Sequence, residues 1–115
     1  MWSILQYNKP DDYVTGTGES HSVKEFVEKA FSYAGLKWKK YVEIDSRYFR
    51  PTDVNNLVAD TRKVKKAFKW QPKVKFNDLV KIMIDADMRS AGLEPVGEGD
   101  KILKQKFPRR WWKVD

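Results

Sequence analysis

A Gly-Thr-Gly turn at residues 16–18 lies between a strand-like segment and a helix-like one, where a dinucleotide-binding loop would lie. Such a loop has a third glycine, but His21 stands at that position. It also needs an acidic residue at a strand end about twenty positions further on, and none stands there. The pattern therefore favours an ordinary turn over a phosphate-binding loop.

A second pattern, Tyr33 followed four residues later by Lys37, has the spacing of an acid/base pair in dehydrogenases. That chemistry requires both side chains on the same face of one helix. Gly35 lies between them and is expected to end the helix. We interpret the spacing as chance and predict no catalytic residues in this chain.

Residue types exclude further classes of site. The chain has no cysteine, so it cannot hold a disulfide, a thiolate metal site or a cysteine nucleophile. The single histidine, His21, makes a zinc site or a Ser-His-Asp triad improbable. We expect His21 to be partly exposed, and we predict no metal site.

The chain has 115 residues, a net charge of +7 and 41% apolar residues, which is sufficient for one packed domain. Residues 100–115 hold six basic and two acidic side chains, and residues 62–75 hold seven basic side chains and no acid. Only these stretches favour a nucleic-acid or membrane-surface partner, and the second is typical of a solvated helix face. No apolar run approaches the ~18 residues of a membrane span, and no signal peptide is recognisable. We expect a cytoplasmic protein.

The clearest element is a helix over residues 23–34. Ser22 and Glu25 have the spacing of a capping box, in which each side chain binds the backbone at the other residue. Apolar residues follow at helical spacing, and Gly35 is expected to end the helix in a left-handed conformation. Further helices are predicted over residues 61–69 and 78–88, and residues 1–8 are similar to the end of a helix.

Two segments favour strands. Residues 13–15 form a short apolar stretch between turn residues, and residues 36–44 alternate with period two. The predicted fold class is α/β, as an α+β small lobe with about three helices, two or three short strands and no complete Rossmann domain. We place one domain at residues 1–92, and a linker with a basic, aromatic tail at residues 93–115.

The sequence resembles the GDP-mannose 4,6-dehydratase family over roughly residues 1–90. The most specific block is Arg-Tyr-Phe-Arg-Pro-Thr followed by an acid, at residues 47–53. The other matching segments are residues 9–14, 17–26, 60–64, 70–74, 76–80 and 86–87.

This resemblance implies an extended short-chain dehydrogenase/reductase, which converts GDP-mannose to the 4-keto-6-deoxy sugar with bound NADP. It implies that this chain is the carboxyl-terminal part, with the last strand of the nucleotide sheet and a portion of the sugar-nucleotide lobe. Arg50 then matches the arginine that holds the GDP diphosphate, and Asp53 matches a glutamate that contacts the ribose. A guanidinium suits phosphate oxygens, and a carboxylate accepts hydrogen bonds from paired hydroxyls.

The departures from the family limit what the chain does alone. The cofactor loop and the catalytic residues lie upstream in the family, so no cofactor site is expected here, and NADP is implied only for the complete enzyme. We therefore expect a GDP-mannose-binding or GDP-binding fragment that requires an upstream Rossmann-half chain for catalysis. Asp53 is also one methylene shorter than the usual glutamate, which puts the ribose contact in doubt.

A non-enzymatic alternative remains open at this point. The interleaved cations and aromatic residues of residues 101–114 suit a single-stranded nucleic acid, an anionic lipid surface or the acidic groove of an assembly partner. The same stretch also suits a terminal arm that folds back over apolar surface. The first interpretation makes the chain a binding or structural protein that uses its lobe as a scaffold, and the second assigns the tail no partner.

Overall fold

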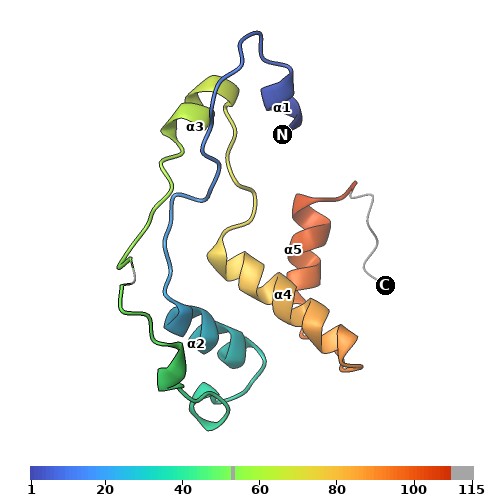
Figure 1. Cartoon of the computed structure of the whole chain (residues 1–115). Helices are drawn as coiled ribbons and strands as arrows, with labels where there is room; N and C mark the ends of the chain where they lie inside the picture. Colours follow the sequence, from blue (N-terminus) through green and yellow to red (C-terminus); the bar gives the residue numbers. More distant parts are fainter. Residues whose placement is uncertain (53, 110–115) are drawn as a thin grey trace. The chain divides into compact units, whose positions relative to one another are not determined.

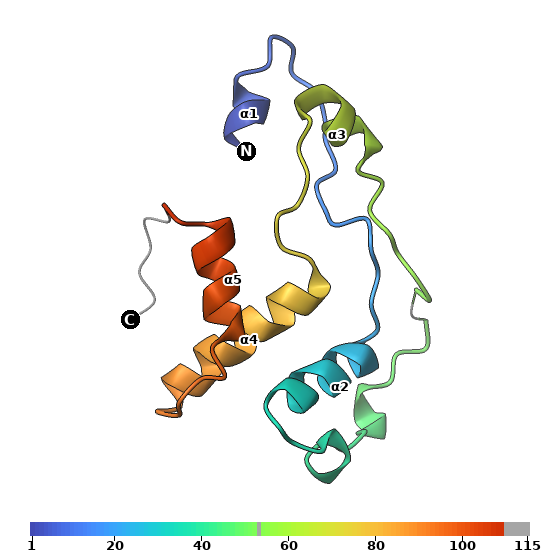
Figure 2. The same ribbon diagram turned by 180° about the vertical axis from the view of Figure 1, so that it is seen from behind.

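The computed structural model describes residues 1–52 and 54–109. Its α-helices are α1 (Trp2–Leu5), α2 (Val23–Tyr33), α3 (Arg62–Phe68), α4 (Phe76–Ser90) and α5 (Glu98–Lys106), and two short 3-10 helices are η1 (Trp38–Lys40) and η2 (Ser46–Tyr48) (Figures 1 and 2). The chain divides into two compact units. Unit 1 contains residues 1–20 and 52–73, and unit 2 contains residues 21–51 and 74–115.

Helix α2 begins where its sequence predicts. The Ser22 hydroxyl accepts a hydrogen bond from the Glu25 backbone N–H at 3.0 Å, which is half of the expected capping box. The Glu25 carboxylate does not bind the backbone N–H of Ser22, as the second half of the box requires, and instead contacts Nδ1 of His21 at 3.0 Å. Gly35 follows the helix with a φ of +74°, a left-handed conformation that glycine adopts without a steric penalty.

Helix α4 packs against both α2 and α5 within unit 2. The backbones of α4 and α5 approach closely at Gly99, which is buried. A Cβ atom added there would lie 2.7 Å from Cα of Ile82, and nearer still to the carbonyl oxygen of Lys81. Only a residue without a side chain therefore permits this helix contact.

Unit 1 is organised around aromatic rings. Phe68 of α3 contacts Tyr7 and Tyr13 edge-on, with ring centroids 5.3 and 5.0 Å away. Lys63, also on α3, forms an ion pair with Asp11 at 2.7 Å and lies 5.0 Å from the centre of the Tyr13 ring. These contacts hold the amino-terminal segment of unit 1 against α3.

The predicted α/β fold class is wrong, because the described residues are helical and contain no strand. Residues 13–15 are irregular, and part of the alternating segment 36–44 forms η1. A strand is stabilised by backbone hydrogen bonds to a neighbour, which its own side-chain alternation cannot supply. No extended segment pairs with either stretch in the described part of the chain.

The helices predicted over 23–34, 61–69 and 78–88 are confirmed, as α2, α3 and α4. The stretch predicted to be a linker and tail contains α5, which the sequence did not indicate. Among the described residues, no helix has the length and apolar character that a membrane crossing requires.

Candidate functional site

The segment that precedes Arg50 is held by one carboxylate. Asp45 caps η2 by accepting a hydrogen bond from the Arg47 backbone N–H at 3.0 Å. The same carboxylate binds the Arg47 guanidinium through Nε at 3.0 Å and Nη2 at 2.7 Å. Asp45 thus fixes the start of the turn and forms an ion pair with Arg47, the first arginine of the Arg-Tyr-Phe-Arg block.

Asp60 and Arg62 repeat this arrangement at the start of α3. The Arg62 backbone N–H donates to Asp60 Oδ1 at 3.1 Å, and its Nη2 donates to Oδ2 at 2.6 Å. In both pairs an aspartate two residues before an arginine binds its backbone and its guanidinium together. The motif is therefore a local way to neutralise an arginine.

These pairs shift the pKa of each carboxyl group. The hydrogen bonds from the Arg62 side chain, and then from its backbone, lower the pKa of Asp60 to about 2. The pKa of Asp45 is lowered by the same two contributions from Arg47. Both carboxylates consequently stay ionised, and both arginines stay paired, throughout the neutral pH range.

Arg50 differs from these two arginines. Its side chain is exposed, and no ion pair with it occurs among the described residues. It lies in unit 2, directly before Pro51. The other predicted site residue, Asp53, lies outside the described residues, so its predicted ribose contact stays a prediction. The structure thus presents Arg50 as a cation available to an external anion.

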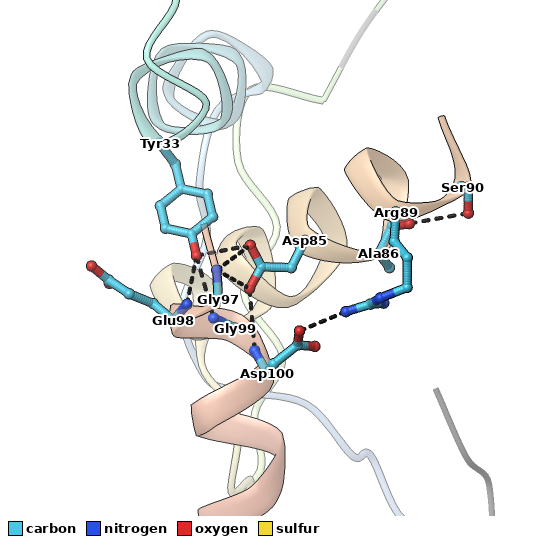
Figure 3. A network of polar contacts seen from close by, with 9 residues as sticks. All are labelled: Tyr33, Asp85, Ala86, Arg89, Ser90, Gly97, Glu98, Gly99 and Asp100. Atoms are coloured by element: carbon cyan, nitrogen blue, oxygen red, sulfur yellow. Dashed lines mark hydrogen bonds and ion pairs between the residues drawn. The ribbon is translucent and has the colours of Figure 1, made fainter. Parts of the chain in front are cut away.

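Sequence reasoning missed the most organised polar cluster, which joins α2, α4 and α5 (Figure 3). Asp85 of α4 has none of its surface exposed. Its Oδ1 accepts a hydrogen bond from the Tyr33 hydroxyl at 3.0 Å, and the carboxylate also accepts from the backbone N–H groups of Gly97 and Asp100 at 3.1 and 3.2 Å. The Tyr33 oxygen in turn accepts from the N–H groups of Glu98 and Gly99, at 3.1 and 3.3 Å.

Together these bonds cap α5 completely. The N–H groups of the cap residue and of the first three helical residues have no partner inside a helix. In α5 these are residues 97–100, and each of the four N–H groups donates to Tyr33 or Asp85. Gly97 has no side chain with which to cap the helix itself. The cap is therefore tertiary, and its two acceptors come from two other helices.

Burial raises the pKa of the Tyr33 hydroxyl, and hydrogen bonding to the Asp85 carboxylate raises it further, while the Gly99 N–H acts in the opposite direction. Tyr33 is thus neutral and fully hydrogen-bonded. This agrees with the interpretation that its spacing from Lys37 is chance, since the hydroxyl is occupied in capping α5.

Three ion pairs extend the contact between α4 and α5. Arg89 binds Asp100 at 2.5 Å (Figure 3), and the remaining pairs are Lys81 with Glu98 and Lys106 with Asp78. Two of the cations in this set, Lys81 and Arg89, belong to α4, and Lys106 belongs to the basic tail. Part of the tail's positive charge is therefore used inside unit 2.

The position of Asp85 in the sequence does indicate that its side chain is buried. It follows Ile84 directly and lies three residues after Ile82, inside an apolar helical pattern. A carboxylate is rarely buried at such a position unless it has partners. The sequence could have marked Asp85 as a buried acceptor, but it gave no indication of which donors it binds.

The glycine turn at residues 16–18 also has a structural explanation. A Cβ added at Gly16 would lie 2.9 Å from Cβ of Ala59, so the absence of a side chain permits a close approach within unit 1.

His21, the single histidine, stacks on Phe76 with ring centroids 3.8 Å apart. No group of three side chains suited to a metal ion occurs in residues 1–52 and 54–109.

Comparison with known proteins gives one consistent result. The model of the GDP-mannose 4,6 dehydratase family matches residues 1–83. The chain is 56% identical over 96 residues to GDP-mannose 4,6 dehydratase 1 of Arabidopsis thaliana, a match that covers 84% of this chain and 27% of the relative. Identity is 42% over 118 residues with the Dictyostelium discoideum protein, covering 88% and 32%, and 38% over 112 residues with the human protein, covering 83% and 30%. The chain thus spans less than a third of the length of these relatives.

Proposed function

Since the chain belongs to the GDP-mannose 4,6-dehydratase family, we propose that it is the carboxyl-terminal, GDP-sugar-binding part of such an enzyme. In this proposal Arg50 binds the diphosphate of GDP-mannose or GDP. The guanidinium is planar and permanently charged, and it matches phosphate oxygens with two parallel hydrogen bonds. Asp53 is assigned to the ribose, as the resemblance implies.

The observation that supports this role is the contrast among the arginines near the family block. Arg47 and Arg62 each bind a neighbouring carboxylate through backbone and side chain, whereas Arg50 is exposed and has no such partner in the described part of the chain. An arginine whose charge is already matched gains little from a phosphate. Arg50 retains its full capacity for one.

The reaction itself requires more than this part supplies. We propose that a Rossmann half provides NADP and the catalytic residues, and that the chain described above contributes substrate binding without catalysis of its own. The NADP requirement and a cytoplasmic location are expectations from the resemblance. Formation of the 4-keto-6-deoxy sugar by the purified chain with NADP would contradict the assignment of catalysis to the Rossmann half.

A thermal melt with nucleotides tests the binding role. Arg50 alone supplies about 1.5–3 kcal/mol as a charged hydrogen-bond donor, so a Kd no better than roughly millimolar is expected. Ligand at ten times its Kd adds ~1.4 kcal/mol of stability, which raises Tm by several degrees in a domain of this size. GDP and GDP-mannose should raise Tm, and ADP should not.

The matched control is a second arginine with the same charge. Arg50→Ala should abolish the rise in Tm, whereas Arg62→Ala, which removes one exposed positive charge from unit 1, should leave it intact. A Tm that none of the three nucleotides changes would refute GDP binding. Equal effects of both substitutions would show that net charge, and not Arg50, governs the response.

A further inference from the structure

The turn that follows α2, residues 37–40 (the lysine turn), is held in place by backbone and ring contacts. The backbone N–H groups of Tyr41 and Val42 both donate to the carbonyl oxygen of Trp38, at 3.0 and 3.1 Å. The ring of Tyr41 stacks on Phe31 of α2, with centroids 5.8 Å apart. The side chains of the lysine turn are therefore presented by an ordered backbone at the end of α2.

Three of the four residues in the lysine turn are exposed cations, namely Lys37, Lys39 and Lys40. None of them forms an ion pair within the described part of the chain. By contrast, Lys63 and Lys106 belong to the two stretches that composition singles out, and each is paired with an aspartate. The lysine turn thus retains three positive charges within four residues.

A cavity of about 390 Å³ is lined by the four residues of the lysine turn. Its wall is apolar. In these residue types the apolar atoms are those of the Trp38 indole and of the methylene stems of the lysines. The volume lies in the range of small-molecule sites. The lysine turn therefore offers an apolar surface for a flat ring, together with ammonium groups that attract anions.

This combination discriminates among anionic partners. Single-stranded nucleic acid supplies both parts, because its bases stack on aromatic rings while its phosphates bind lysines. A membrane surface requires apolar side chains that insert into the lipid, whereas Trp38 is half-buried and lines the cavity. An acidic peptide would neutralise the lysines but would leave the apolar wall without a ligand.

We propose that the lysine turn binds single-stranded nucleic acid. One base stacks on Trp38, and Lys37, Lys39 and Lys40 bind the phosphates on either side of it. The site lies in unit 2 and does not use Arg50, so it is independent of the proposed GDP site.

The salt dependence of binding tests the phosphate contacts. The complete chain of 115 residues is titrated into a fluorescein-labelled oligothymidylate, and fluorescence anisotropy gives the binding constant at about 50–200 mM salt. Three lysine contacts with a single strand predict a slope of about −2 when the logarithm of the binding constant is plotted against that of the salt concentration. Lys37→Ala combined with Lys40→Ala should bring the slope to about −0.7 and weaken binding at least about tenfold at the lowest salt concentration.

Lys101→Ala combined with Lys104→Ala is the matched control. Both lysines are exposed on α5 in the same unit, and their spacing equals that of Lys37 and Lys40. The control should leave the slope and the affinity unchanged. Equal weakening by the two double variants would show that overall charge governs binding, and weakening by the control alone would move the site to α5. Either result would overturn the inference.

Trp38→Ala tests the stacking contact. It should weaken binding about fivefold or more without changing the salt slope. Trp38→Phe retains an aromatic face and should keep most of the affinity, and a thermal melt of each variant checks that it is folded. A DNA duplex of the same length should bind more weakly, because its bases are already stacked on one another. Equal affinity for duplex and single strand, or unchanged affinity in a folded Trp38→Ala, would overturn the inference.

Two further measurements separate this site from its alternatives. Arg50→Ala should bind the oligothymidylate like the wild-type chain and lose only the effect of GDP on Tm, so each proposal can fail alone. Absence of oligothymidylate binding would overturn the inference. If the chain then bound vesicles of phosphatidylcholine and phosphatidylserine, the lysine turn would be assigned to a membrane surface.

Discussion

The two units are stabilised in different ways. In unit 2 the amino terminus of α5 is capped by Tyr33 and the buried Asp85, and ion pairs connect α5 to α4. Unit 1 depends on a small ring cluster around Phe68, while apolar side chains such as Leu57 stay exposed. Its ion pairs lie at the surface, and Asp60 with Arg62 joins near neighbours, whereas Asp11 with Lys63 joins the amino-terminal segment to α3.

This difference shows that the number of charged contacts is a poor guide to their importance. A surface pair between neighbours contributes little, because water solvates both charges and the chain already holds them together. Asp85 joins elements distant in sequence and has no access to water, so its loss leaves several buried groups without partners. The following substitutions test this contrast, beginning with the largest expected effect.

Asp85→Ala is expected to release α5. It removes the acceptor for the Tyr33 hydroxyl and for two N–H groups, at a cost of about 3–5 kcal/mol by analogy with broken buried charge networks. Hydrogen exchange of the α5 backbone and a urea melt measure the loss. Asp87→Ala is the matched control, because Asp87 is an exposed carboxylate on the same helix. Retained protection of α5 in Asp85→Ala would refute the capping role.

Gly99→Ala should destabilise unit 2, although alanine is the better helix former by roughly 1 kcal/mol. Its added methyl group would collide with the α4 backbone at Lys81 and Ile82, and overpacking of this kind costs about 1–3 kcal/mol. A lower midpoint in a urea melt is therefore expected. Lys104→Ala, at an exposed position of α5, should leave the midpoint nearly unchanged. A rise in stability for Gly99→Ala would contradict the close helix contact.

Tyr33→Phe preserves the ring but leaves the N–H groups of Glu98 and Gly99 without an acceptor, which costs about 1–2 kcal/mol. The same hydroxyl predicts a pH dependence. Because its pKa is raised in the folded state, its contribution is complete below the ordinary tyrosine value and is lost as pH rises through the folded pKa. An alkaline melt of the wild-type chain should show this loss, and Tyr33→Phe should lack it. Identical alkaline profiles would contradict the assignment.

The smallest effect is expected for Asp60 in unit 1. Its pKa is lowered to about 2, so the pair with Arg62 is complete above the ordinary aspartate value near 4 and is lost as pH falls toward 2. Because the pair is exposed, stability should change very little across this range. Nuclear magnetic resonance of the Asp60 carboxyl gives its pKa, and Asp60→Asn should melt like wild type. A destabilisation comparable to that of Asp85→Ala would remove the distinction between the units.

The sequence predicted those parts of the fold that are encoded locally. The Ser22 cap, the apolar stripe and Gly35 bounded α2 to within one residue, and similar patterns located α3 and α4. The strand predictions failed, because alternation over residues 36–44 indicates a half-buried segment but not a second segment with which it could form backbone hydrogen bonds. For the candidate site, the family block identified Arg50, but only the structure showed that Arg47 and Arg62 are already paired.

By itself, the sequence determined the family, the three well-patterned helices and the absence of cysteine chemistry. The tertiary structure alone decided that residues 98–106 are helical and that Tyr33 is a capping residue. The physical reason is the location of the hydrogen-bond acceptors. Ser22 caps α2 from the adjacent position, whereas the Tyr33 oxygen that caps α5 lies 65 residues before Glu98. Such a cap exists only after α2 and α4 have brought their side chains to the start of α5.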